Sequence, residues 1–373
     1  MIIKKETTRF SDENNHVFFG YYDVSPIDYE NKYMLAMHLP LARDDQMMSV
    51  GYYDLNDSSK IFNSIGQTET WCWQQGCRLR WLPSEENCVI FNTIVDSRYG
   101  AIIYDLKSNK VLREINSPIY DIDPKGEIGA SLNFSRLQRL RPGYGYKRIP
   151  DHSISEMKPK YDGLFLVDIK NNGLKMVVSL DEISNYKNEK IIPNSEHYIN
   201  HIFFSPDSRY IFFFHLWADK KSRDSRLFRY DIEKDKLKLI IDNTVSHYTW
   251  KDDKSFIITE FHNEKLSYNI YDLDGSLQSV IGNDLLIKDG HPSFCSKNDF
   301  LISDTYPNYF GFQQLFKYDL KLNSYTPLCN FYTKSKFQGE QKCDLHPRLS
   351  HDGKTVCVDV VDNGKREMAI ISL

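Results

Sequence analysis

Ser205-Pro206-Asp207-Ser208-Arg209-Tyr210-Ile211-Phe212 and, further along, Tyr230-Asp231-Ile232 together decide the fold of this chain. In the first stretch, Pro and Asp supply the geometry of a tight turn between two apolar strands. The second stretch ends a strand, and the turn after it leads into another apolar strand, Leu237-Lys238-Leu239-Ile240. The two signatures therefore mark out four consecutive short strands, which is the unit of one propeller blade.

Both signatures recur along the chain. Looser copies of the turn are Asp123-Pro124-Lys125-Gly126, Lys251-Asp252-Asp253-Lys254, Ser296-Lys297-Asn298-Asp299 and Ser350-His351-Asp352-Gly353. The strand-ending signature occurs as Tyr53-Asp54-Leu55, Tyr104-Asp105-Leu106, Val167-Asp168-Ile169, Tyr230-Asp231-Ile232, Tyr271-Asp272-Leu273, Tyr318-Asp319-Leu320 and a degenerate Ile370-Ile371-Ser372-Leu373. A spacing of about 40 to 65 residues suits one four-stranded blade with variable loops. The sequence therefore predicts an all-β, seven-bladed β-propeller.

The last blade ends on its third strand at Leu373, so its fourth position is open. The segment Ile2 to Phe10 precedes the first blade, and we expect it to fill this position and close the ring. No Gly/Pro-rich linker interrupts the chain, which predicts a single domain over residues 1–373. An α/β enzyme is disfavoured because amphipathic helical stretches and a Gly-x-Ser-x-Gly elbow are both missing from the sequence.

The composition agrees with a sheet protein and limits the partners. The 24 Tyr and 22 Phe residues suit half-buried strands. A net charge of -4 gives no general attraction to nucleic acid, and no stretch has the length and apolarity of a signal peptide or a membrane span, so we expect a cytoplasmic protein. The seven cysteines form no Cys-x-x-Cys pair, and we interpret them as reduced, buried thiols.

A second pattern appears shortly before each turn, six residues before its Asp in blades four, five and seven, where we place the start of the innermost strand. From blade one to blade seven, the residues there are Tyr21, Arg78, Ile119, His201, His247, His291 and His346. Because innermost strands line the axis of a propeller, these positions should form a ring around one mouth of its channel. Only 11 of the 373 residues are His, so four in succession indicate a shared site. Convergent imidazoles suit a divalent transition metal or proton transfer.

Two of these histidines lie in segments that resemble oligogalacturonate lyases, seven-bladed propeller enzymes that cleave uronic-acid oligomers with a manganese-type ion. The segments are Asp289-Gly290-His291-Pro292-Ser293-Phe294 and Gln341-Lys342-Cys343-Asp344-Leu345-His346-Pro347. The resemblance implies a divalent metal, Mn or Zn, at His291, Gln341, Asp344 and His346, with His247 at the position of the family's catalytic His. Where the family has a further His, this chain has Asp344, whose carboxylate is also a competent ligand. Ulvan lyases, propellers that use His, Tyr and Arg, are a second similar group.

Long loops between second and third strands should emerge on the same face as the histidines. The longest, between Leu132 and Phe165, is Arg- and Tyr-rich and far longer than a hairpin turn, which indicates a function. Arg forks match carboxylates, so these loops predict an acidic ligand. The residues that we expect to bind the substrate are Tyr21, Arg78, Arg98, Arg136, Arg139, Arg141, Arg148, His215 and Tyr306.

The leading hypothesis is a lyase that cleaves a uronic-acid-containing oligo- or polysaccharide by β-elimination. This reaction needs neutralisation of the carboxylate, a base for the C5 proton, and an acid for the leaving oxygen. We expect His247 as base, Arg223 or Arg226 as carboxylate partner, Tyr144 or Tyr146 as acid or stacking residue, and His201 beside them. The alternatives are a non-catalytic scaffold or glycan-binding module, and a metal-dependent glycan hydrolase. Release of an unsaturated uronate separates the lyase from both.

Overall fold

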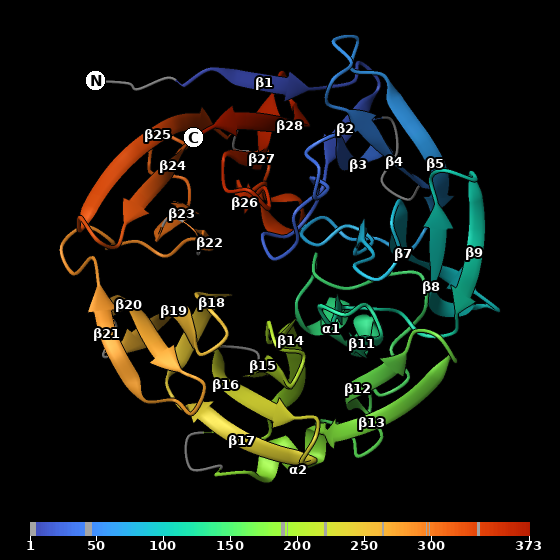
Figure 1. The fold of residues 1–373 in the computed structure, drawn as a ribbon. Coiled ribbons are helices and arrows are strands. Elements are labelled where there is room, and N and C mark those ends of the chain that lie inside the picture. Colours follow the sequence, from blue (N-terminus) through green and yellow to red (C-terminus); the bar gives the residue numbers. More distant parts are fainter. Residues whose placement is uncertain are drawn as a thin grey trace.

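Seven four-stranded antiparallel sheets surround a central axis in the computed structural model, which confirms the seven-bladed propeller (Figure 1). The structure describes residues 5–41, 47–187, 191, 193–219, 222–262 without the side chain of residue 262, 265–295, 297, 299–333 and 336–373. Among these residues, no helix is long and apolar enough to cross a membrane. All seven cysteines are described; they are buried, and none is in a disulfide.

Each of the first four blades runs from an innermost to an outermost strand in chain order. Blade one comprises β2 (Asn15–Phe18), β3 (Tyr33–Pro40), β4 (Met48–Asp54) and β5 (Phe62–Thr68). Blade two comprises β6 (Arg80–Trp81), β7 (Cys88–Val95), β8 (Arg98–Asp105) and β9 (Lys110–Ile115). Blade three comprises β10 (Asp121–Ile122), β11 (Ile128–Ser131), β12 (Gly163–Asp168) and β13 (Gly173–Ser179). Blade four comprises β14 (Glu196–Phe204), β15 (Tyr210–Ala218), β16 (Arg223–Asp231) and β17 (Lys236–Ile241).

The last three blades complete the circle, and only the seventh departs from chain order. Blade five comprises β18 (Thr244–Trp250), β19 (Ser255–His262), β20 (Lys265–Asp272) and β21 (Leu277–Ile281). Blade six comprises β22 (Ser293–Cys295), β23 (Phe300–Asp304), β24 (Phe312–Asp319) and β25 (Ser324–Tyr332). Blade seven comprises β26 (Arg348–Leu349), β27 (Thr355–Asp362), β28 (Lys365–Ser372) and β1 (Thr7–Phe10).

Short helices lie in the connections. In the long blade-three loop, α1 (Phe134–Leu140) begins where the Asn133 side chain accepts a hydrogen bond from the backbone N–H of Arg136. Helix α2 (Leu180–Asn185) is capped in the same way by Ser179 and follows β13. A single 3-10 turn, η1 (Gly339–Gln341), precedes blade seven. The helix in the long loop gives it a fixed shape, which an irregular excursion would lack.

The strand-ending signature has a direct physical role. Each of its six complete copies places its Asp at the last residue of the third strand, where most of these carboxylates accept hydrogen bonds from backbone N–H groups of the turn, as Asp319 does from Lys321 and Leu322. In three blades the Tyr hydroxyl of the signature also reaches a residue with positive φ five positions later; Tyr230, for example, donates to Asp235. The motif therefore fixes the hairpin to the outermost strand.

The N-terminal segment closes the ring as predicted. Strand β1 pairs with β28, from Thr7 opposite Ile371 to Phe10 opposite Met368. Phe10 is buried, and its ring packs against that of Tyr53 in blade one, with centroids 4.9 Å apart. Residues 2 to 4, which we also expected in this strand, lie outside the described residues. Strands from both ends of the chain therefore share one sheet. They give the seventh blade its fourth strand and close the ring.

Deleting residues 1–10 should therefore destabilise the whole propeller. The loss of a paired strand and of one buried Phe ring costs about 3–5 kcal/mol, which corresponds to a fall of roughly 10 °C in Tm for a chain of this size. Thermal unfolding followed by circular dichroism measures this fall. A deletion of residues 1–6, which keeps β1, is the matched control; equal Tm values for the two deletions would contradict closure through β1.

Candidate functional site

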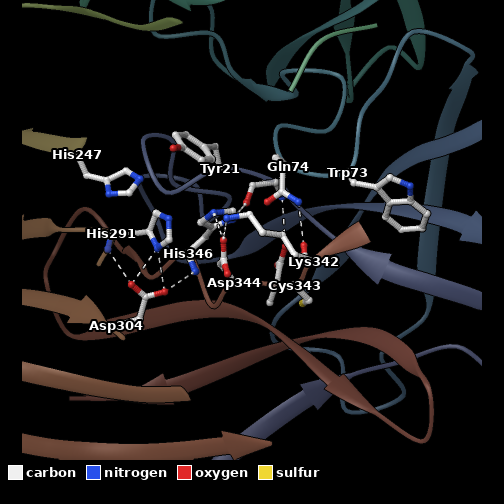
Figure 2. Close-up of polar contacts among 12 residues, drawn as sticks. Tyr21, Trp73, Gln74, His247, His291, Asp304, Lys342, Cys343, Asp344 and His346 are labelled. Carbon is white, nitrogen blue, oxygen red and sulfur yellow. Dashed lines mark hydrogen bonds and ion pairs between the residues drawn. The ribbon is translucent and has the colours of Figure 1, made fainter. Parts of the chain in front are cut away.

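Four histidines from consecutive blades converge on the propeller axis. The ring centroids of His247 and His291 are 4.3 Å apart, those of His291 and His346 4.4 Å, and those of His201 and His247 5.6 Å. The ring of Tyr21 lies near all four, with centroid distances between 4.8 and 6.5 Å. Figure 2 shows Tyr21 with His247, His291 and His346. All five side chains are buried. The four histidines that the repeat makes equivalent are therefore also neighbours in space.

The position of these residues in their strands differs from the prediction. His291 and His346 directly precede β22 and β26, as expected, but His201 and His247 lie inside β14 and β18. In both strands the pairing register shifts at this point, between Asn200 and Phe203 in β14 and between Val245 and Tyr248 in β18. A β-bulge turns a side chain out of the regular alternation. The bulges thereby direct these two imidazoles to the axis.

One buried carboxylate, Asp304, orients two of the histidines. Its oxygens accept hydrogen bonds from the Nδ1 and backbone N–H of His291 at 2.7–3.0 Å, and from the backbone N–H of His346 at 3.3 Å (Figure 2). His346 donates from Nδ1 to the carbonyl of Gly20 at 2.9 Å. Both rings therefore use Nδ1 as donor. Within the described part of the chain, neither Nε2 atom has a hydrogen-bond partner.

One ring nitrogen each of His291 and His346 and a carboxylate oxygen of Asp344 lie within 4.8 Å of one another, a group that could hold a metal ion. His346 Nε2 lies 4.0 Å from Asp344 Oδ2. Burial lowers the pKa of His346 well below its usual range, which keeps this imidazole neutral and able to coordinate. At His291, burial also lowers the pKa, but the charge of Asp304 outweighs it and the net shift is upward. Lys342 Nζ lies 2.6 Å from Asp344 Oδ2 and, against the effect of burial, contributes to the lowered pKa of Asp344.

His247 has its own carboxylate. Its Nδ1 lies 3.3 Å from Asp289 Oδ1, and Ser246 Oγ donates to the other oxygen of Asp289 at 2.6 Å. Burial lowers the pKa of His247 despite this neighbour, while the charge and hydrogen bond of His247 bring the pKa of Asp289 to about 2. A carboxylate at Nδ1 favours the tautomer whose Nε2 is free to accept a proton. An imidazole held in this way can accept a proton at Nε2.

Tyr21 and His201 form the remaining side of the cluster. The Tyr21 hydroxyl lies 2.6 Å from His201 Nε2, and the pKa of His201 falls well below its usual range, mainly through burial. Burial in turn raises the pKa of Tyr21 well above 10.0. Both groups are therefore neutral near pH 7.

Two cations and two further tyrosines cover the cluster. The Arg141 guanidinium lies over the ring of Tyr144 at 4.1 Å, and Tyr144 contacts Tyr21 with centroids 6.0 Å apart. Lys342 lies over Tyr306 at 5.1 Å, and Tyr306 contacts His291 at 5.6 Å. Burial opposes the ionisation of Tyr144, but the positive charges of Arg141 and Lys342 lower its pKa to about 8. The site therefore combines imidazoles with a positively charged wall.

Comparison of this fold with solved structures identifies similar proteins. An oligogalacturonate lyase in complex with manganese superposes with a TM-score of 0.71 at 12% identity, over 100% of this chain and 94% of that chain. An oligogalacturonate lyase from Vibrio parahaemolyticus superposes with a TM-score of 0.66 at 12% identity, over 100% and 98%. The chain has the fold of the oligogalacturonate lyases. No protein-family model and no curated protein matches the sequence. The resemblance to ulvan lyases stays a prediction.

At 12% identity the likeness to oligogalacturonate lyases shows the fold alone, so the roles of individual residues depend on this chain's own geometry. Of the residues singled out in the sequence, the structure brings together Tyr21, Arg141, Tyr144, His201, His247, His291, Tyr306, Asp344 and His346. Gln341 is half-buried in η1, and its backbone carbonyl accepts a hydrogen bond from Arg366. Its side chain is left as a candidate ligand.

Several of the expected substrate-binding arginines bond to the protein itself. Arg78 forms a two-pronged ion pair with Asp23 and also donates to the carbonyl of Tyr120. Arg136 donates to three backbone carbonyls and to Ser153. Arg139 is held by Asp151 and Glu196. These guanidinium groups hold the loops of blades two and three in place, because buried donors require partners.

The remaining candidates divide into buried and exposed groups. Tyr146 stacks on Phe134 and accepts a hydrogen bond from Asn92. Arg226 donates to His215 and to backbone carbonyls in and just after α2. Tyr146, His215 and Arg226 therefore all have partners inside the fold. Arg98 and Arg223 are exposed, and Arg148 pairs with Glu69 at the surface. Arg223 lies near enough to Tyr198 to lower its pKa, although burial dominates and the net shift is upward.

Sequence reasoning missed Asp289, Asp304 and Lys342. Asp289 and Lys342 stand inside the two quoted motifs, so their spacing from His291 and His346 could have identified them. Asp304 ends β23 and reaches His291 across the sheet edge, which only the folded chain reveals. A carboxylate at Nδ1, as His247 and His291 have, was the general signal to look for.

A buried pair of histidines in blade four, outside the axial cluster, makes the stability of the fold sensitive to acid. His215 and His197 are hydrogen-bonded at 2.9 Å, and burial lowers the pKa of His197 to about 4. Since the unfolded value is about 6.5, the contribution of His197 is fully present above pH 6.5 and is lost as the pH falls towards 4, by up to about 3 kcal/mol. Denaturant unfolding at pH 7 and pH 4.5 should show a smaller loss in His197→Gln than in the wild type. Identical losses would contradict a neutral buried pair.

Proposed function

We propose that this protein is a metal-dependent lyase that cleaves a uronic-acid-containing oligo- or polysaccharide by β-elimination. The observation that carries the proposal is the pair of buried Nε2 atoms of His291 and His346, which have no hydrogen-bond partner among the described residues, with His247 beside them on its own carboxylate. The fold shared with oligogalacturonate lyases supports it. Buried polar atoms without partners are costly, and they persist where a ligand completes them.

His291, His346 and Asp344 would hold the metal, with Gln341 as a further candidate ligand. Two imidazole nitrogens and one carboxylate suit Mn or Zn. Asp304 at Nδ1 of His291, and the Gly20 carbonyl at Nδ1 of His346, are the outer hydrogen bonds that metal-binding histidines usually make. A bound divalent cation would withdraw charge from the substrate carboxylate and so acidify the neighbouring C5 proton. The described donor set therefore fits the group that the fold implies.

Arg141 is our candidate for the carboxylate partner, in place of Arg223 or Arg226. No carboxylate among the described residues forms an ion pair with its guanidinium, which lies among Tyr21, Tyr144 and Tyr198. A largely buried cation without an acidic partner is favourable where an anionic ligand provides the charge. Arg226, by contrast, donates to backbone carbonyls, and Arg223 is exposed.

The proton steps are assigned by position. His247 would accept the C5 proton at Nε2, since Asp289 and Ser246 lie at its Nδ1. Tyr144, across Tyr21 and next to Arg141, would donate a proton to the leaving oxygen. Tyr21 and His201, hydrogen-bonded to each other, would form one wall beside the substrate, and Tyr306 would stack on a sugar face.

The proposed activity is tested by presenting uronate-containing glycans to the purified protein with Mn or Zn and following the ultraviolet absorbance of the unsaturated uronate product. Cleavage with growth of this absorbance is the expected result. Cleavage without it indicates a hydrolase, and binding without cleavage indicates a glycan-binding module. Either of these two outcomes would overturn the lyase assignment.

Replacing His291 or His346 with Ala should lower the metal content of the purified protein substantially. Each change removes one of three converging ligands, so affinity should fall by at least about 10- to 100-fold. Metal analysis after dialysis against a fixed concentration of Mn measures it. His38→Ala, a buried histidine of blade one that bonds to Tyr53, is the matched control and should keep the metal. Full occupancy in both site variants would remove the metal-site proposal.

His247→Ala should abolish turnover while keeping the metal and the fold. A general base contributes about 10²- to 10⁴-fold in rate, so the loss should fall in this range. Steady-state kinetics, metal analysis and thermal unfolding on the same preparation separate the effects. Asp289→Asn should give a smaller loss, because the imidazole stays in place with a weaker partner. Loss of metal in step with activity would make His247 a ligand instead.

A further inference from the structure

One side-chain cation contacts the group that could hold the metal. Lys342 Nζ lies 2.6 Å from Asp344 Oδ2; the Asp344 side chain is 3% exposed, and Lys342 is half-buried. The same carboxylate oxygen lies 4.0 Å from His346 Nε2. The ammonium group of Lys342 and a divalent cation at this group would therefore compete for one oxygen of Asp344.

The main chain at Lys342 is fixed from two directions. Its carbonyl oxygen accepts hydrogen bonds from Gln74 Nε2 at 2.8 Å and from a guanidinium nitrogen of Arg366 at 2.7 Å. Figure 2 shows Gln74 next to Lys342. Arg366 is itself buried and also donates to the carbonyls of Trp73 and Gln341. These contacts hold the backbone, so a change of partner for the Lys342 ammonium requires rotation of its side chain alone.

The flexible stem of Lys342 gives its ammonium group a second partner. Nζ lies 5.1 Å from the centre of the Tyr306 ring, within the range of a cation–π contact. An ion pair with a buried carboxylate is stronger than such a contact, so Asp344 is the preferred partner as long as no other cation holds it. When another cation binds Asp344, the ammonium group can turn away and stay at the site over Tyr306.

A metal at Asp344 would meet this ammonium group as a competitor. Binding at Oδ2 requires the metal to break the 2.6 Å ion pair, and the displaced positive charge then lies close to the metal. Like charges repel most strongly away from water, and Asp344 is buried. Lys342 therefore makes the metal site weaker than the same three ligands would be without it.

We propose that Lys342 is a built-in counter-ion of the metal site: its ammonium group neutralises Asp344 until a divalent cation displaces it. The inference rests on the proposed function for the metal. Lys342 thus lowers the metal affinity, while it stabilises the fold when no metal is bound, because it pairs a buried carboxylate. The displaced ammonium group stays beside Tyr306, where it adds to the positive charge that Arg141 offers an acidic substrate. Metal binding thereby prepares the site for an anion.

Calorimetric titration of the intact protein with Mn²⁺, in the absence of any glycan, tests the proposal. Lys342→Met removes the ammonium group and keeps most of the side-chain volume, so the affinity for Mn²⁺ should rise by about tenfold or more. Lys342→Arg keeps the positive charge and should keep the wild-type affinity. Lys147→Met is the matched control, because Lys147 also lies 2.6 Å from a carboxylate, that of Glu340, but is exposed; it should leave the affinity unchanged.

Thermal unfolding with and without Mn²⁺ is a second measurement. Without Mn²⁺, Lys342→Met should unfold at a lower temperature than the wild type, because Asp344 loses its ion-pair partner. A fixed concentration of Mn²⁺ should then raise the Tm of the variant more than that of the wild type, since tighter binding stabilises more. If Lys342→Met does not fold, Lys342→Gln, which is also uncharged, replaces it. A lysine that served only for packing would lower the Tm without raising the metal affinity.

The outcomes separate this inference from the proposed function. Binding of Mn²⁺ by the wild type that is equal to or tighter than binding by the uncharged variant overturns the counter-ion and leaves the metal-dependent lyase. Binding by the uncharged variant but not by the wild type supports the counter-ion and rejects the metal dependence, because Lys342 then holds Asp344 permanently. Absence of binding to both proteins rejects both proposals.

Discussion

The seam between blade seven and blade one is the constraint on which the site depends. Pairing of β1 with β28 brings the two ends of the chain together, and Asp359 and Arg348 of blade seven then bond to the backbone of Phe19 and Gly20 in blade one. His346 uses the same Gly20 carbonyl to fix its ring. Gly20 has a φ of 132°, and a Cβ there would lie 2.9 Å from the backbone of Gln75, so only glycine fits. Closure thus places Tyr21 against the histidines.

Carboxylates behind the imidazoles give otherwise similar residues different properties. His291 and His247 each face an Asp, but the pKa of His291 is raised and that of His247 is lowered, because the balance of burial and charge differs between them. His346 faces a carbonyl and has a strongly lowered pKa. A cluster of four imidazoles could not be charged throughout, since like charges at these distances repel. His291 and His346 therefore each donate from Nδ1 and keep an Nε2 atom that has no hydrogen-bond partner in the described part of the chain.

The arginines illustrate how much of a charged loop serves the fold. A sequence rich in Arg over residues 136–148 suggests a wall of anion-binding forks, but burial requires most buried guanidinium groups to find internal partners. Arg136 and Arg139 are used in this way by the loop itself. Arg141 differs because its neighbours are tyrosines, which cannot neutralise it as a carboxylate does. This difference makes one arginine a better candidate for the substrate carboxylate than its neighbours.

The sequence by itself determined the number of blades, their order, the strand that closes the ring and the four equivalent histidines. These features are local or periodic: an Asp equivalent to Asp231 in Tyr230-Asp231-Ile232 ends the third strand in six of the seven blades. Only the tertiary structure decided which groups face one another. Asp304 reaches His291 and His346 from a different strand, bulges in β14 and β18 turn His201 and His247 to the axis, and Arg78 pairs with Asp23 of the preceding blade. Such pairings depend on distances across blades, which the order of residues along the chain does not encode locally.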